Sequence, residues 1–145
     1  MAESHIYVTN VQWSVDRKGK LSTNGMPVIE VATPVEFPKG HPNIWSPEHL
    51  YVGAAEVCLM TTFLAVAEKA ALSFLNYTSK AEGRLEKTED GFLFTEITIY
   101  PRVVVTNQED VEKARTLFER AKRHCLISNS MKTKVTVEPT VIVKS

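Results

Sequence analysis

The stretch SPEHLYVGAAEVCLMTTFLAVAEKAAL, residues 46–72, decides the fold of this 145-residue chain. Ser46 is a residue type that accepts a hydrogen bond from an early helical amide, and Pro47 suits the first position of a helix. Small or apolar residues then fall on every helical face: Leu50, Val52, Ala54, Ala55, Val57, Cys58, Leu59, Met60, Thr61, Phe63, Leu64, Ala65 and Ala71. The stretch therefore predicts a long helix that begins at Ser46-Pro47, ends near Leu72 and is apolar nearly all round.

A helix that is apolar nearly all round is also buried nearly all round. A chain of this length forms one domain by default, here residues 1–145. A domain of that size can hardly enclose such a helix alone. We therefore expect a second copy of the chain to cover part of the helix, in a homodimer.

Charge and hydropathy exclude several classes of protein. Seventeen basic and 17 acidic residues give a formal net charge of zero, which lacks the basic footprint of non-specific nucleic-acid binding. In the weakly polar stretch from residue 50 to 74, Glu56, Glu68 and Lys69 argue against a membrane span. Residues 1–5 have neither the basic nor the apolar region of a secretory signal. We therefore expect a cytoplasmic protein that binds neither nucleic acid nor membranes.

Short β-strands are predicted before the helix. Residues 6–13 alternate imperfectly between apolar and polar and suggest an opening strand. In the turn that follows, Gly19 is free to take a positive φ. Residues 21–23 and 28–32 look like strands on either side of an Asn24-Gly25 hairpin turn. The N-terminal part of the chain is therefore predicted as β-structure.

Further strands and a second helix are predicted after the first helix. Residues 76–85 and 92–105 read as two strands joined by a turn. A helix follows from about residue 108 to 123, with Asn107 or Thr106 as its cap. The chain closes with a strand that is interrupted at a proline and contains Val135, Val137, Val141 and Val143. The order β-β-β-α-β-β-α-β predicts an α+β fold with a mainly antiparallel sheet.

The two cysteines, Cys58 and Cys125, are the first candidates for chemistry. Structural disulfides are rare in the cytoplasm, so a cysteine pair there is more often catalytic, redox-active or metal-binding. Taken singly, Cys58 reads as a small core hydrophobe and Cys125 as a loop thiol. The two lie too far apart in sequence for a CxxC motif, and their spacing does not say whether they meet.

Neither metal nor hydrolase chemistry is supported by the sequence. A zinc site needs clustered ligands. The chain offers two cysteines and four histidines without a recognised ligand spacing: His5, His41, His49 and His124. No nucleophile elbow indicates a Ser-His-Asp hydrolase. We therefore expect no metal site.

Four other residues carry weak signals when each is taken alone. Arg17 reads as an exposed turn residue, and Glu48 reads as a first-turn carboxylate that the helix dipole favours. His49 reads as a helix-surface residue and Trp45 as a packing residue. Only together with the two cysteines do these residues point to a function.

Three segments resemble those of a known family. Residues 46–58 are similar to a family segment in which Pro-Glu-x-Leu leads into a helix that carries the reactive cysteine. The segment CLISNSM, residues 125–131, resembles the family's second-cysteine segment, and RKGKLST, residues 17–23, resembles its early arginine turn. Over nearly its whole length the chain thus resembles the OsmC/Ohr family, the osmotically inducible and organic hydroperoxide resistance proteins.

The resemblance implies a fold, an assembly and an activity. The fold would be OsmC-like with a long buried central helix, and the assembly an intertwined homodimer with active sites at the subunit interface. Cys58 would attack an organic hydroperoxide and Cys125 would resolve the product, with Arg17 and Glu48 organising the thiolate. A dithiol such as a dihydrolipoyl group would be the reductant, and no metal or flavin cofactor would be needed.

These residue types suit peroxide chemistry. Attack needs a thiolate, whereas a free cysteine has a pKa of about 8.5, which an apolar helix raises further. Arg17 is the candidate for the positive group that reverses this rise. Attack gives a sulfenic acid at Cys58, which condenses with Cys125 to a disulfide. An apolar lining that favours organic hydroperoxides over hydrogen peroxide would come from Val57, Leu59, Met60 and Phe63.

Glu48 and Cys58 are ten residues apart on the predicted helix. At 1.5 Å per residue they lie roughly 15 Å apart along its axis, which is beyond the reach of a carboxylate. If Glu48 belongs to the site, either the partner chain delivers it or the chain folds back before the helix begins.

The chain departs from the family pattern at three places. Leu126-Ile127 follows the second cysteine, where Pro-Val is common. Glu56 stands two positions before Cys58, where small residues are frequent, but two helical positions are about 200° apart, so Glu56 should face away from the thiol. His49 stands where Gln or Glu is often found. These departures bear on substrate and catalytic rate more than on fold.

Two other functions remain open on the sequence alone. A dimeric protein of this fold could bind a small apolar ligand in its interface cleft without peroxidase activity. A redox sensor could use the same cysteines without rapid turnover. Steady-state peroxide consumption with a dithiol reductant separates these alternatives from the enzyme.

Overall fold

The long helix predicted from the sequence is α1, Pro47–Lys69, and it begins at the predicted residue. The side-chain oxygen of Ser46 accepts a hydrogen bond from the His49 backbone amide at 3.1 Å. The carbonyl of Ser46 accepts one from the Leu50 amide at 2.9 Å. Ser46 is therefore the N-cap, and Pro47 is the first helical residue.

The end of α1 comes earlier than the predicted end near Leu72. Ala71 has a left-handed backbone with a φ of 56°. The Leu72 amide donates to the Ala67 carbonyl at 2.9 Å, and the Ala71 amide donates to the Glu68 carbonyl at 3.1 Å. These two hydrogen bonds form a Schellman motif, which usually carries glycine at the left-handed position. An alanine stands there instead, so no residue type in the sequence marks the end of the helix.

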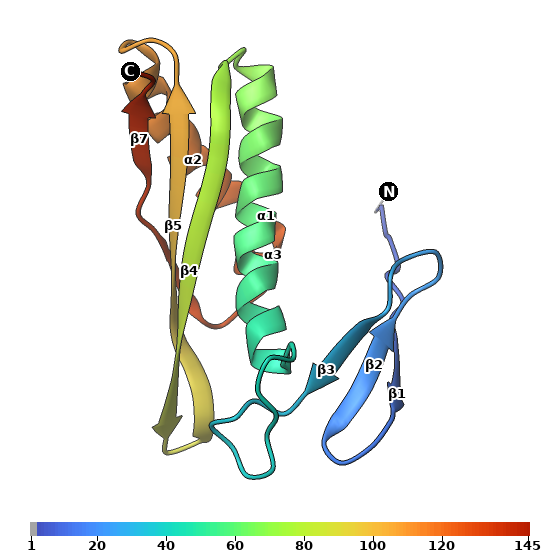
Figure 1. The fold of residues 1–145 in the computed structure, drawn as a ribbon. Coiled ribbons are helices and arrows are strands. Elements are labelled where there is room, and N and C mark those ends of the chain that lie inside the picture. The colour runs from blue at the N-terminus through green and yellow to red at the C-terminus, as the bar shows by residue number, and fades with distance from the viewer. Residues whose placement is uncertain (1–2) are drawn as a thin grey trace. The chain divides into compact units, whose positions relative to one another are not determined.

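The structure, a computed structural model, describes residues 3–145, which form one compact unit up to Tyr51 and another from Val52 onward. The first unit holds a three-stranded antiparallel sheet (Figure 1). Its strands, in spatial order, are β1 (Asn10–Trp13), β2 (Lys18–Ser22) and β3 (Ile29–Ala32). The opening strand thus starts later than residue 6, where the sequence pattern placed it.

The prediction of a positive φ at Gly19 is wrong. Gly19 pairs with Trp13 inside the β1–β2 ladder, and the left-handed residue of the turn is Asp16, with a φ of 53°. Aspartate tolerates this conformation better than most residues. Glycine is needed at position 19 for another reason, because a Cβ there would lie 2.8 Å from the Gln12 carbonyl oxygen.

The second unit is built on a long antiparallel hairpin of β4 (Phe74–Thr88) and β5 (Gly91–Val105). Gly91 has a φ of 96°, which suits the tight connection between the strands. The Thr88 hydroxyl donates to the Gly91 carbonyl at 2.8 Å and holds the turn closed. The strand pair predicted from the sequence is therefore confirmed, and both strands extend further toward the turn than predicted.

The closing strand is split as predicted, but it runs parallel to its neighbour. β6 (Lys134–Val137) and β7 (Thr140–Val143) both pair with β5 in parallel, and Pro139 lies in the gap between them. The α+β fold class is thus confirmed. The sheet is mixed, because the crossover through the second helix returns the chain to β5 in the same direction.

The second helix is α2, Asp110–His124, and the short helix α3, Leu126–Asn129, follows it. The residue before α2 is Glu109, and no side chain caps this end by a hydrogen bond. The predicted caps, Asn107 and Thr106, are therefore wrong. The carbonyl of Asn107 instead accepts a hydrogen bond from the Asp110 amide at 3.1 Å, in a turn that leads into the helix.

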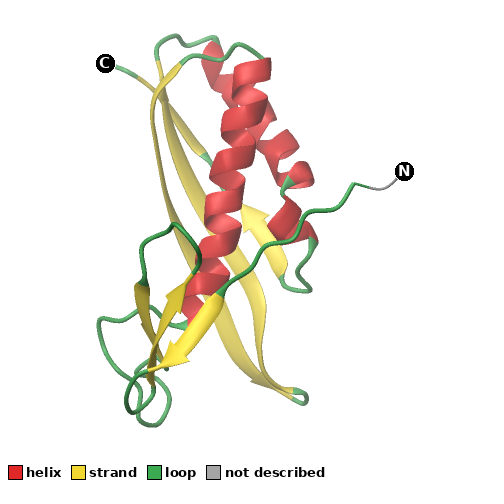
Figure 2. Ribbon diagram, turned by 90° about the vertical axis from the view of Figure 1, so that its right-hand side faces the viewer, coloured by secondary structure: helices red, strands yellow, loops and turns green. Residues whose placement is uncertain are grey.

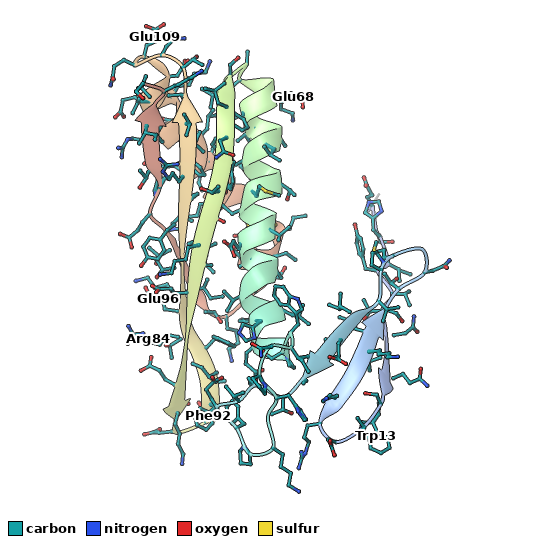
Figure 3. All side chains as sticks on the ribbon, viewed as in Figure 1. Trp13, Glu68, Arg84, Phe92, Glu96 and Glu109 are labelled. Carbon is teal, nitrogen blue, oxygen red and sulfur yellow. The ribbon has the colours of Figure 1, made fainter. Side chains whose placement is uncertain are left out.

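The helices of the second unit cover one face of its sheet (Figure 2). Phe63 of α1 stacks on Phe118 of α2 with ring centroids 4.1 Å apart. Both rings contact Tyr77 of β4. The core around them includes Ala55, Leu59, Ala67, Ile97, Ile99, Val103, Val105, Ala114, Leu117 and Ala121. The opposite face of the sheet carries Arg84 and Glu96, whose side chains point away from α1 (Figure 3).

One face of α1 is buried in this core and the opposite face is exposed in a single chain. Val57 is 56% exposed and Leu64 is 38% exposed, and Glu68 near the end of the helix points away from the sheet (Figure 3). The other exposed residues on this face are small: Ala54, Thr61 and Ala65. By length and composition alone, α1 would also suit a membrane span. Apolar residues occur on all faces of α1 because one face packs in the core and the opposite face, also apolar, is left uncovered by the single chain.

We expect Ala71→Gly to raise the free energy of unfolding by up to about 1 kcal/mol, because glycine takes the left-handed conformation without a Cβ penalty. The matched control is Ala65→Gly inside α1, which should lower the free energy of unfolding by about 1 kcal/mol. Urea unfolding followed by circular dichroism measures both. Destabilisation by Ala71→Gly would contradict the Schellman ending.

Candidate active site

Cys58 lies in the middle of α1 and is partly exposed. Its sulfur is 3.9 Å from the hydroxyl oxygen of Thr62, one helical turn later. The backbone amides of Leu126 and Ile127 hydrogen-bond with the Cys58 sulfur, as does the side chain of Cys125. The Cys58 sulfur is thus surrounded by donors from α1 and from the segment that follows α2.

Cys125 connects the two later helices. It is the C-cap of α2 and the N-cap of α3, and its backbone is extended, with φ −72° and ψ 107°. The Cys125 residue is 1% exposed, and its sulfur accepts a hydrogen bond from the Ser128 hydroxyl at 3.1 Å. This junction aims the buried Cys125 thiol at α1.

The two thiols meet, which their sequence spacing alone did not show. Cys58 and Cys125 are hydrogen-bond partners, and both are free rather than joined in a disulfide. α1 brings the first thiol and the α2–α3 junction brings the second. The structure therefore holds the reduced form of two neighbouring cysteines, each of which acts on the pKa of the other.

The surroundings shift the pKa values of the two thiols in opposite directions. Burial raises the pKa of the Cys58 thiol, but hydrogen bonds from the Ile127 amide, Cys125, Thr62 and the Leu126 amide stabilise the thiolate and leave its pKa below the ordinary value. Burial raises the pKa of the Cys125 thiol, and although Ser128 lowers it, the neighbouring Cys58 adds to the rise. Cys58 is thus the more acidic thiol of the pair, and Cys125 is the less acidic one.

Sequence reasoning missed most of the donors at Cys58. It assigned the lowering of the Cys58 pKa to Arg17, whereas within the second unit the Leu126 and Ile127 amides and Thr62 have this effect. Backbone amides carry no mark in a sequence. In the structure these amides belong to the start of α3, where the first amides of a helix are left free to donate.

Arg17 and Glu48 both lie in the first unit. Arg17 is exposed on the turn before β2, where its carbonyl accepts a hydrogen bond from the Thr33 amide at 3.2 Å. Glu48 is the second residue of α1. One of its carboxylate oxygens is buried and has no hydrogen-bond partner among residues 3–145. The approach of these two residues to a Cys58 stays a prediction.

The unbroken helix α1 keeps Glu48 far from the Cys58 of the same chain. The helix runs unbroken from Pro47 to Lys69, so Glu48 and the Cys58 of the same chain lie roughly 15 Å apart along its axis. His49, the next residue, shares a hydrogen bond of 2.7 Å with the Ser46 hydroxyl, and its ring lies edge-on to Trp45 with centroids 6.3 Å apart. His49 therefore supports the start of the helix.

Glu56 turns away from Cys58, as its helical position predicts. Its carboxylate accepts a hydrogen bond from the Ser79 hydroxyl on β4 at 2.5 Å. It is not among the groups that shift the Cys58 pKa. This departure from the family pattern therefore leaves the thiolate undisturbed.

The apolar surface beside the thiols differs from the predicted lining. Leu59 and Phe63 are 1% and 0% exposed and pack in the core, so they offer no surface to a ligand. Leu126 and Ile127 are 76% and 38% exposed, and their amides contact Cys58. The residues next to Cys58 that expose apolar side chains are thus Leu126 and Ile127.

The described residues do not form a metal centre. Within residues 3–145, no three His, Cys, Asp or Glu side chains gather in a way that could hold an ion.

Comparison with known proteins identifies relatives of this chain. The family model for OsmC-like proteins matches residues 40–140. YmaD, an uncharacterized protein of Bacillus subtilis strain 168, is 26% identical over 149 residues, which cover 99% of this chain and 97% of YmaD.

Solved structures agree in fold. An OsmC-like protein of unknown function from Vibrio cholerae has a TM-score of 0.85 at 24% identity, over 94% of this chain and 99% of its own. An organic hydroperoxide resistance protein OsmC from Legionella pneumophila has a TM-score of 0.74 at 25% identity, over 97% of this chain and 100% of its own. The fold that the resemblance implied is therefore confirmed.

We expect Leu126→Pro to raise the Cys58 pKa, because proline lacks the amide that donates to the sulfur. Proline suits the first residue of α3, and the extended Cys125 backbone suits the residue before a proline. Alkylation of Cys58 at neutral pH should slow about two- to tenfold, the range expected for the loss of one hydrogen bond.

The matched control is Leu126→Ala, which keeps the amide and removes only the exposed side chain. Cys58 in this variant should react at the wild-type rate, as measured by mass spectrometry after timed alkylation. Equal slowing in both variants would assign the effect to the side chain and remove the amide from the mechanism.

Proposed function

Because the chain belongs to the OsmC-like family, we propose that it is a thiol peroxidase that reduces organic hydroperoxides with Cys58 and Cys125. One observation carries the proposal. The two thiols act on each other's pKa, and their surroundings lower the pKa of Cys58 while raising that of Cys125. This asymmetry provides a nucleophile and a resolving thiol in one pair.

The first step is attack by the Cys58 thiolate on the terminal oxygen of the hydroperoxide. A sulfur–oxygen bond forms and the oxygen–oxygen bond breaks, so Cys58 becomes a sulfenic acid and the leaving alkoxide takes a proton to become an alcohol. The amides of Leu126 and Ile127 and the hydroxyl of Thr62 hold the thiolate ready for this attack.

The second step joins the two sulfurs. Cys125 loses its proton and attacks the Cys58 sulfur, so the disulfide forms and the sulfenic oxygen leaves as water. A dithiol of the lipoyl type then reduces the disulfide and returns both cysteines to thiols. We place this cycle in the cytoplasm, where such reductants keep cysteines reduced.

The substrate class follows from the surface beside Cys58. Leu126 and Ile127 expose apolar side chains next to Cys58. Burial of an alkyl group against them favours an organic hydroperoxide over hydrogen peroxide, which has no apolar part. A relative from Legionella pneumophila is named as an organic hydroperoxide resistance protein, which supports the same class.

A second copy of the chain is proposed to complete the site. The exposed apolar face of α1, defined by Ala54, Val57, Thr61, Leu64 and Ala65, has the composition of an obligate interface. Such a homodimer would let one chain bring its Arg17 and Glu48 to the Cys58 of the other, with Glu48 holding the guanidinium by paired hydrogen bonds. The buried, unpartnered oxygen of Glu48 supports a charged partner for this carboxylate.

We expect Cys58→Ser to abolish reduction of cumene hydroperoxide, because no thiolate remains to attack. Cys125→Ser should allow one turnover and then lose activity as Cys58 overoxidises. Steady-state assays with dihydrolipoamide and mass spectrometry of Cys58 measure both effects. Rapid formation of a sulfenic acid in Cys58→Ser would show that the roles of the two cysteines are reversed.

Heterodimers test the shared site directly. We expect Arg17→Ala and Cys58→Ser each to be inactive alone, and co-expression under two affinity tags to restore about half of the wild-type activity. In the mixed dimer, an intact Arg17 meets an intact Cys58 across the interface. Sedimentation should confirm a dimer at low micromolar concentration in every sample. Inactive mixed dimers, or a folded monomer, would contradict the shared site.

A further inference from the structure

Tyr77 is a half-buried residue of the second unit whose hydroxyl oxygen is fully buried. It lies on β4 opposite Val103, and its ring centroid is 5.6 Å from that of Phe63 on α1 and 6.0 Å from that of Phe118 on α2. Contacts with both helices and the strand fix the direction of the ring, and with it the position of the hydroxyl group.

The Tyr77 hydroxyl has no partner in the core that would explain its presence. Its oxygen is buried and makes no hydrogen bond within residues 3–145. A buried hydroxyl without a partner costs about 1–3 kcal/mol, and phenylalanine would fill the same space without this cost. Few such groups occur in native proteins, and each one calls for an explanation.

Two acidic groups act on this hydroxyl. Burial raises the Tyr77 pKa, and the charges of the Glu56 carboxylate and the Cys125 sulfur raise it further. The hydroxyl therefore keeps its proton at neutral pH and can act only as a neutral hydrogen-bonding group. The Glu56 carboxylate already accepts a hydrogen bond from Ser79. The Cys125 sulfur, by contrast, requires additional hydrogen-bond donors when it loses its proton.

The charge on Cys125 does change in the proposed cycle. In the resting pair, Cys58 is the more acidic thiol and Cys125 is the one that holds its proton more tightly. Once Cys58 carries an oxygen, Cys125 has to ionise in order to attack, and it is 1% exposed. A buried thiolate without sufficient donors is strongly disfavoured, and Ser128 supplies only part of what is needed.

We propose that Tyr77 is a positioning residue for the disulfide-forming step: its hydroxyl donates a hydrogen bond to the Cys125 sulfur when Cys125 ionises to attack the oxidised Cys58. This inference rests on the proposed function. The S–S bond forms, the S–O bond of the sulfenic acid breaks, and the proton released by Cys125 joins the departing hydroxide to make water. Tyr77 keeps its own proton throughout.

Tyr77→Phe tests the proposal, because it removes one oxygen and keeps the ring. One equivalent of cumene hydroperoxide is added to reduced protein, and quenched samples are analysed by mass spectrometry. Oxidation of Cys58 should keep its wild-type rate, whereas formation of the Cys58–Cys125 disulfide should slow about tenfold, as expected for a lost hydrogen bond to a charged group. The thermal midpoint should stay the same or rise, because an unsatisfied hydroxyl is gone.

A second measurement uses no peroxide. In a Cys58→Ser background, the pH dependence of Cys125 alkylation by iodoacetamide should move to higher pH when Tyr77→Phe is added. The matched control is Tyr100→Phe, which removes a hydroxyl from an exposed tyrosine on β5. This control should change neither the alkylation profile nor the rate of disulfide formation.

The outcomes separate the two proposals. If the wild type does not react with hydroperoxide, the proposed function fails, whereas the alkylation profile still reports whether Tyr77 acts on Cys125. An unchanged alkylation profile together with an unchanged disulfide rate would overturn the role of Tyr77. A marked loss of stability in Tyr77→Phe would also overturn it, because the hydroxyl would then have a structural partner.

Discussion

The stacking of Phe63 on Phe118, with centroids 4.1 Å apart, is the contact on which the second unit depends. It joins α1 to α2, and Tyr77 contacts both rings from β4. Cys58 precedes Phe63 on α1 by little more than one turn, and Cys125 ends the helix that carries Phe118. This aromatic contact therefore joins the helix that carries Cys58 to the helix that ends at Cys125, two elements far apart in the sequence.

Much of the fold could be predicted because its signals are local. Ser46-Pro47 marks the start of α1, and alternation marks the hairpin of β4 and β5. The errors arise where the cause is not local. The Gly19 backbone approaches Gln12 on another strand, and the end of α1 is a left-handed Ala71 that nothing in its residue type announces. The parallel direction of β6 and β7 likewise follows from the path of the chain through α2.

The candidate site could be predicted only in part, for a similar reason. The sequence indicates which residues carry reactive groups, and Cys58 and Cys125 stand out as its only thiols. It does not indicate their contact, nor the donors around Cys58, because those are largely main-chain amides. Where related proteins often have proline after the second cysteine, Leu126 keeps an amide that donates to the Cys58 sulfur. The departure from the family pattern at Leu126 therefore adds a hydrogen bond to the Cys58 sulfur.

The dependence of Cys58 on the amides of Leu126 and Ile127 has a consequence during synthesis of the chain. Cys58 leaves the ribosome long before those residues are made, and at that stage its thiol lies on a segment with no core to pack against. Without the amides it has the acidity of an ordinary cysteine, close to a pKa of about 8.5, and is mostly protonated in the cell. The Cys58 thiol of the nascent chain is therefore less acidic, and forms less thiolate, than that of the folded protein. The lowered pKa appears only when the last helices have been made and folded against α1.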